Sequence, residues 1–170
     1  MDITILQETY FGNSLYQYLI SITALAAGFI ILKIAQLIVI GRLKKMADKT
    51  KTDFDDFLIK LVKAVFVPFA YFGVFYLCFQ MLQLNEHFNK ALRIVGVAVI
   101  TFYVTKLVVA LIDYGFSVYV DRRGRDISVM KSLAGIIRVT KLIMWGLAIC
   151  FYLDNLGFEI SAVIAGLGIG

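Results

Sequence analysis

Four long apolar runs divide the sequence and constrain its fold more than any other feature. Three of them, residues 15–40, 64–84 and 94–112, contain only two charged side chains, Lys33 and Lys106. A helix needs about 20 predominantly apolar residues to cross the hydrocarbon of a bilayer. Each of these runs is therefore predicted to be a membrane-spanning helix.

The composition leads to the same class of protein. Of the 170 residues, 61% are hydrophobic and 17% are charged, and the mean hydropathy is +0.85. A soluble domain is about 45–50% apolar and about 25% charged, so a sphere of this volume cannot bury so many apolar side chains. The aromatic content and the single proline exclude a disordered chain. The predicted fold class is an all-α membrane protein.

The fourth run, residues 133–153, carries Arg138 and Lys141 near its beginning. Long basic side chains near a helix end reach the headgroups, so this run is also predicted to span the bilayer. A fifth apolar segment, residues 160–170, is too short to cross. Either the segment is re-entrant or the chain is the front part of a longer protein. We expect the second, because nothing in the last residues resembles a natural end.

Basic residues are concentrated in two connections between the predicted spans. These residues are Arg42, Lys44, Lys45, Lys49 and Lys51 in the first connection, and Arg122, Arg123, Arg125 and Lys131 in the second. The opposite side carries only Lys90 and Arg93. The positive-inside rule then places the N-terminus outside and whatever follows Gly170 in the cytoplasm.

Residues 52–61 are predicted to form an amphipathic helix before the second span. Acidic residues fill its first turn, and Phe54, Phe57, Leu58 and Leu61 fall on one stripe at helical spacing. This pattern indicates a lead-in helix at the membrane surface. The following span contains the single proline, Pro68, which is expected to bend it.

The last segment separates bulky from small side chains. At 100° per residue its bulky side chains fall on one arc of the helix, and the remaining positions carry small side chains. The small residues are Ser161, Ala162, Ala165, Gly166, Gly168 and Gly170. Small side chains allow close approach between membrane helices, so we expect this segment to pack between neighbours, as in a symmetric ring. A helix inside a single-chain bundle remains the alternative. A dinucleotide-binding loop is rejected because no strand precedes the glycines.

Residues 153–170 closely resemble the entry to the pore helix of the small-conductance mechanosensitive channel family, and residues 126–153 resemble the helix before it. The resemblance implies an additional N-terminal hairpin (1–90), a sensor-like hairpin (91–156) and the start of a pore-lining helix (157–170). It also implies a homo-oligomer of seven subunits. The family's gate residues, cytoplasmic β-domain and vestibule would follow Gly170.

Two further groups of charged residues are candidate functional positions. Lys106 lies within the predicted span 94–112 and Asp113 directly follows it. Both are candidate intramembrane charges on nearly the same helix face, but they are too far apart to pair directly. Lys106 is either an ion or voltage element or a snorkelling or interhelical lysine. The second group comprises Arg122, Arg123, Arg125, Lys131, Arg138 and Lys141. It determines topology, binds anionic headgroups, or couples the sensor-like helices to the cytoplasmic body, as the resemblance implies.

No pattern in the sequence indicates an enzyme. Cys78 and Cys150 have no nearby cysteine or histidine, which argues against a disulfide or a zinc site, and His87 is interpreted as a solvated loop residue. No paired carboxylates and no activated nucleophile are visible. We expect no catalytic residue, metal or cofactor, and no nucleic-acid partner despite the net charge of +5.

These observations predict a subunit of a mechanosensitive ion channel in the inner, cytoplasmic membrane. Membrane tension would open it and release ions and small solutes during hypo-osmotic stress, with membrane lipids and identical subunits as partners. The alternative is a multi-span transporter or membrane scaffold component that packs as a single-chain bundle and uses Lys106. A strand-rich domain after Gly170 would favour the channel, and further spans would favour the transporter.

Overall fold

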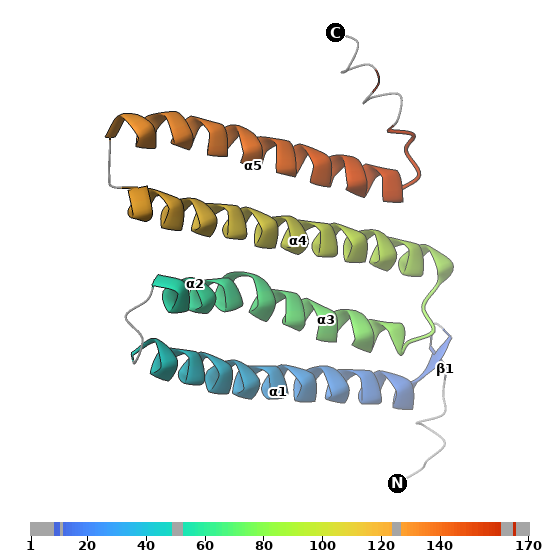
Figure 1. Cartoon of the computed structure of the whole chain (residues 1–170). Helices are drawn as coiled ribbons and strands as arrows, with labels where there is room; N and C mark the ends of the chain where they lie inside the picture. Colours follow the sequence, from blue (N-terminus) through green and yellow to red (C-terminus); the bar gives the residue numbers. More distant parts are fainter. Residues whose placement is uncertain (1–8, 11, 49–52, 124–126, 161–164, 166–170) are drawn as a thin grey trace. The chain divides into compact units, whose positions relative to one another are not determined.

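The structure is a computed structural model that describes residues 9–10, 12–48, 53–123, 127–160 and 165. Within these residues the chain is almost entirely helical (Figure 1). It divides into two compact units, Met1–Gly96 and Val97–Gly170, which are described separately below. Among the described residues, four helical stretches are long and apolar enough to cross a membrane, so the predicted all-α membrane fold is confirmed. The stretches are Leu15–Ala47, Phe54–Gln80, Glu86–Asp121 and Leu133–Asn155.

The first unit begins with a short feature that the sequence did not predict. Strands β1 (Thr9–Tyr10) and β2 (Asn13–Ser14) pair antiparallel directly before helix α1 (Leu15–Ala47). Ser14 caps α1, since its Oγ accepts from the Gln17 amide at 3.3 Å and the Gln17 side chain accepts from the Ser14 amide at 2.8 Å. This reciprocal pair is a capping box, which satisfies two otherwise unpaired donors.

Helix α1 ends later than the apolar pattern predicted. It continues from residue 40 to Ala47, so that Arg42, Lys44 and Lys45 lie on the helix instead of in the connection. The physical reason is that lysine and arginine are good helix formers. Their charge also favours the negative C-terminal end of the helix dipole.

The second span consists of three consecutive helical segments: α2 (Asp53–Leu61), the π-helical turn η2 (Val62–Phe66) and α3 (Val67–Gln80). In η2 the Val67 amide donates to the Val62 carbonyl, one residue further back than in an α-helix. Pro68 follows in the first turn of α3 and has no N–H to donate. The helix is irregular just before Pro68, and the bend expected at that residue stays a prediction.

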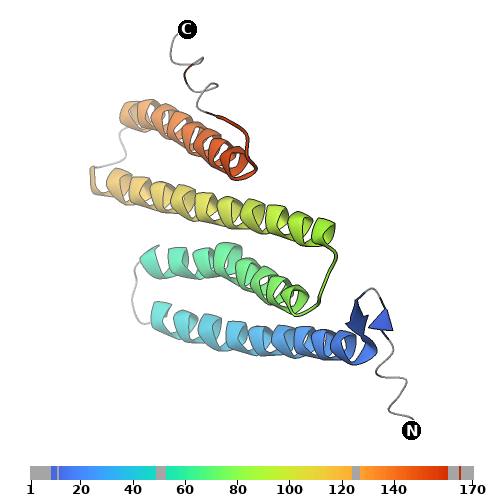
Figure 2. The ribbon, with the colours of Figure 1, turned by 90° about the vertical axis from the view of Figure 1, so that its right-hand side faces the viewer.

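Helices α1 and α3 pack side by side in the first unit (Figures 1 and 2). The buried Ser21 hydroxyl donates to the Cys78 carbonyl at 2.9 Å. At the same end, Asn13 bonds Gln83 twice, donating to its carbonyl at 2.9 Å and accepting from its amide at 2.6 Å. Polar bonds between segments 57 and 70 residues apart in sequence hold this hairpin together.

Helices α4 (Glu86–Arg123) and α5 (Ile127–Asn155) complete the described spans. The second unit contains α4 from Val97 onward together with α5. Lys90 and Arg93 lie in the first turns of α4, and Arg122 and Arg123 lie in its last turn, whereas the sequence pattern placed them in connections. The apolar run within each helix thus identifies the membrane span, and the polar residues on either side of the run belong to the same helix.

Candidate functional site

An ion pair joins the two helices of the second unit. Asp113 on α4 and Lys141 on α5 pair through one carboxylate oxygen and the Lys141 ammonium. Their side chains are 49% and 32% exposed, respectively. Sequence reasoning placed the two residues in different groups and did not predict the pair, because no local spacing relates positions on separate helices.

Lys106 lies further back along α4 and contacts two rings of its own helix. Its Nζ is 5.9 Å from the ring centroid of Phe102 and 5.9 Å from that of Tyr103. A cation within about 6 Å of a ring centroid is attracted by the ring's negative face. The aromatic residues therefore offset part of the cost of placing this half-buried lysine within a span.

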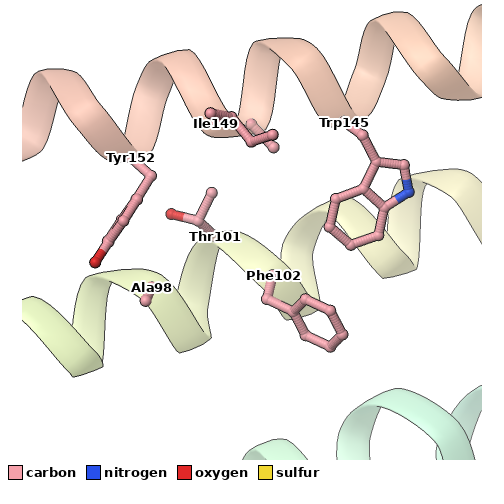
Figure 3. A pocket seen from close by; sticks show the side chains of 7 residues that line it. Ala98, Thr101, Phe102, Trp145, Ile149 and Tyr152 are labelled. Carbon is pink, nitrogen blue, oxygen red and sulfur yellow. The ribbon is translucent and has the colours of Figure 1, made fainter.

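A small apolar cavity of about 130 Å³ lies between α4 and α5 (Figure 3). The residues that line it are Ala98, Thr101, Phe102, Trp145, Ala148, Ile149 and Tyr152. The Phe102 and Trp145 rings approach to 5.4 Å between centroids at one end of it. The Thr101 hydroxyl is buried and has no hydrogen-bond partner among the described residues. The second unit is therefore loosely packed where these two helices face each other.

A glycine turn ends α5 before the terminal segment. Gly157 has φ of +89°, and its amide donates to the Asp154 carbonyl at 2.9 Å while the Phe158 amide donates to the Leu153 carbonyl at 3.2 Å. Bonds of this kind around a left-handed glycine terminate helices. Three residues after Gly157, Ile160 is buried, with 6% of its surface exposed. The turn separates α5 from the predicted pore segment.

Most of the predicted pore-packing positions lie outside the described residues. These are Ser161, Ala162, Gly166, Gly168 and Gly170, whereas Ala165 is described and exposed. Among the predicted coupling residues, Arg125 and the side chains of Arg122, Arg123 and Lys131 also lie outside the description, and Arg138 is exposed on α5. The structure thus brings together Asp113 and Lys141 from the predicted set, and the remaining positions stay predictions.

Two proteins of Methanocaldococcus jannaschii are similar to the chain along nearly all of it. The small-conductance mechanosensitive channel MscMJ is 29% identical over 166 residues, which are 94% of this chain and 47% of that protein. The large-conductance mechanosensitive channel MscMJLR is 22% identical over 176 residues, covering 100% of this chain and 48% of that protein. No family model matches the chain. No solved structure matches it either.

The resemblance of the sequence to mechanosensitive channels is confirmed by these similarities. The chain spans about half the length of the curated relatives it matches. Both relatives are named as channels and neither as an enzyme. The four apolar helices among the described residues support a multi-pass membrane protein.

Proposed function

We propose that the chain is a subunit of a homo-oligomeric channel that membrane tension opens. The observation that carries the proposal is the similarity to two mechanosensitive channels over 94% and 100% of the chain. The open channel releases ions and small solutes during hypo-osmotic stress and catalyses no reaction. Seven copies surround the pore, as the sequence resemblance implies.

Helices α4 and α5 sense the tension in this proposal. Large apolar side chains of α5 are exposed, among them Leu142 at 75% and Ile136 at 61%, and in a bilayer such side chains contact lipid. The ion pair between Asp113 and Lys141 favours movement of the two helices as one body. Tension shifts the equilibrium toward whichever state occupies more membrane area, so an outward tilt of this body opens the pore.

The turn at Gly157 transmits the movement to the pore segment. A left-handed glycine fixes the direction in which the chain leaves α5. The segment from Ile160 onward then follows the end of α5 as that helix tilts. Its small residues, including Ala165 and Gly166, pack against neighbouring subunits and separate when the ring widens.

The orientation follows from the basic residues. The end of α1 and the connection between α4 and α5 lie on the cytoplasmic side, and the N-terminus lies outside. The protein then resides in the cytoplasmic membrane, with its C-terminal continuation toward the cytoplasm. Membrane lipids are its main partners besides identical subunits.

Tension-clamped patches of vesicles containing the whole protein test the proposal. Ala165→Leu and Gly166→Leu are expected to change the opening tension or the oligomer mass, because a bulky side chain prevents close packing in the ring. Gly146→Leu is the matched control, since nothing lies within 4 Å of a Cβ added at Gly146 on α5. Absence of any tension-dependent conductance together with a monomeric mass would refute the channel and favour the transporter.

A further inference from the structure

Basic side chains gather where the first hairpin turns. The residues are Arg42, Lys44 and Lys45 in the last turns of α1, Lys60 at the end of α2 and Lys63 in η2, all of them exposed. Within the described part of the chain, these side chains form no ion pair or hydrogen bond with one another or with other residues. We call this group the α1–α2 basic surface. Its charges are available to a partner.

The packing of α2 determines which of its residues contribute to this surface. Helix α2 lies along the C-terminal part of α1 (Figure 1). Ile59 and Leu61 on α2 and Val65 in the following turn are buried, with 8%, 8% and 5% of their surfaces exposed. The intervening Lys60 and Lys63 are exposed. The lysines of α2–η2 therefore face away from the packed side, as do the basic residues of α1.

An apolar side chain is exposed in the same region. Phe54, in the first turn of α2, has 45% of its surface exposed, and its ring centroid is 6.4 Å from that of Phe57. Exposed aromatic and basic residues together are typical of helices that lie in the interface between hydrocarbon and headgroups. An aqueous partner would satisfy the charges but would leave the Phe54 ring in water. A membrane surface offers anionic headgroups to the basic side chains and an apolar environment to the Phe54 ring.

We propose that the α1–α2 basic surface binds the headgroups of anionic phospholipids. The position fits, because α1 and α3 are apolar spans and the surface lies where the apolar part of α1 has ended. The same stretch of sequence contains four aspartates, Asp48, Asp53, Asp55 and Asp56, yet basic residues outnumber them by seven to four over residues 42–63. The surface therefore favours anionic over zwitterionic lipid by charge. It assigns a lipid-recognition role to the N-terminal hairpin, independent of the proposed channel function.

The π-turn contributes to the arrangement. A π-turn contains about one residue more than an α-turn, so η2 rotates α2 by about 100° relative to an uninterrupted α-helix. With the rotation present, Ile59 and Leu61 are buried and Lys60 is exposed. The irregularity in the second span thereby sets which side chains of α2 face the headgroups.

Native mass spectrometry of the whole protein in detergent tests the binding, with phosphatidylglycerol and phosphatidylcholine as probes. We expect phosphatidylglycerol to bind at least tenfold more tightly. Each basic residue near an anionic surface contributes about fivefold, so Arg42→Gln/Lys44→Gln/Lys45→Gln should lower that affinity by at least tenfold. The matched control is Lys90→Gln/Arg93→Gln, which removes exposed charges at the start of α4 in the same unit. The control should keep its affinity.

Two competitors separate the lipid from other anions. Inorganic phosphate at millimolar concentration and a single-stranded oligonucleotide should each leave phosphatidylglycerol bound. Displacement by either, an equal affinity for the two lipids, or an equal loss in the control would overturn the proposal. If the triple variant loses helicity, Lys60→Gln/Lys63→Gln replaces it. This double variant should bind phosphatidylglycerol at least threefold more weakly, and an unchanged affinity would contradict the proposal.

A fluorescence measurement tests the membrane contact of α2 separately. Within residues 1–170, Phe54→Trp in a Trp145→Phe background leaves a single tryptophan, at position 54, and any tryptophan outside these residues is replaced by phenylalanine in the same background. Lipids spin-labelled near the headgroup should quench its emission more strongly in phosphatidylglycerol vesicles than aqueous iodide does. Stronger quenching by iodide would place the ring in water and contradict the proposal.

Discussion

The close approach of α1 and α3 at Gly28 provides a quantitative test of the first unit. A Cβ added at Gly28 would lie 2.6 Å from Cγ1 of Val74, and 3.6 Å from its Cγ2. Two carbon atoms in favourable contact are about 3.5–4.0 Å apart. Gly28→Ala therefore forces Val74 or one of the helices to move.

The expected magnitude follows from two opposing contributions. Alanine stabilises a helix by about 1 kcal/mol relative to glycine, whereas overpacking a close contact costs about 1–3 kcal/mol. At Gly41 on α1 and Gly73 on α3, nothing lies within 4 Å of an added Cβ, so only the first contribution applies. Gly28→Ala should thus be about 1–3 kcal/mol less stable than Gly41→Ala or Gly73→Ala.

Equilibrium unfolding in mixed micelles, followed by helical circular dichroism, measures these differences. Val74→Ala removes the clashing methyl groups, and a double-mutant cycle with Gly28→Ala should give a favourable coupling of about 1–3 kcal/mol. If Gly28→Ala stabilises the protein as much as the two control variants do, α1 and α3 do not meet at this position. The account of the first hairpin would then be wrong.

Three further contacts are tested by substitution. Asp113→Asn should lower the free energy of unfolding by about 0.5–1 kcal/mol and alter the opening tension in patches. The reversed pair Asp113→Lys/Lys141→Asp should recover at least half of both effects. If it recovers neither, the two residues do not pair directly. Gly157→Ala should cost about 1–2 kcal/mol, because an L-residue is strained at positive φ, and unchanged unfolding would exclude the left-handed turn. Ser21→Ala should cost about 0.5–1 kcal/mol, with faster hydrogen exchange near Cys78 as the readout and unaltered exchange as the contrary result.

The membrane-spanning helices could be predicted from sequence because a bilayer imposes a simple requirement. About 20 apolar residues in succession satisfy it, and residues 15–40, 64–84 and 94–112 fulfil it without reference to any other part of the chain. The ends of the helices were less predictable. The helices continue through polar residues at their ends, namely Lys44, Lys45, Arg122 and Arg123. Hydropathy predicts only the part of a helix that lies in the membrane, whereas the ends of a helix are set by backbone hydrogen bonding.

The resemblance to mechanosensitive channels was also accessible from the sequence, since it depends on the order of residues near the end of the chain. The role of the small residues there remains a prediction, because most of residues 161–170 lie outside the described structure. Their small side chains permit close packing with neighbours but do not by themselves establish which neighbours are present.

Sequence alone determined the class of the protein, the four apolar spans seen among the described residues and the distribution of basic residues along the chain, because each depends on residues that are adjacent or regularly spaced in sequence. Tertiary structure decided which side chains meet. The bond from Ser21 to Cys78 and the pair of Asp113 with Lys141 join residues on different helices, and the exposed side of α2 depends on the π-turn that precedes Pro68. The rotation of a helix about its axis is set by its packing partners, and a nearly uniform apolar sequence leaves that rotation open.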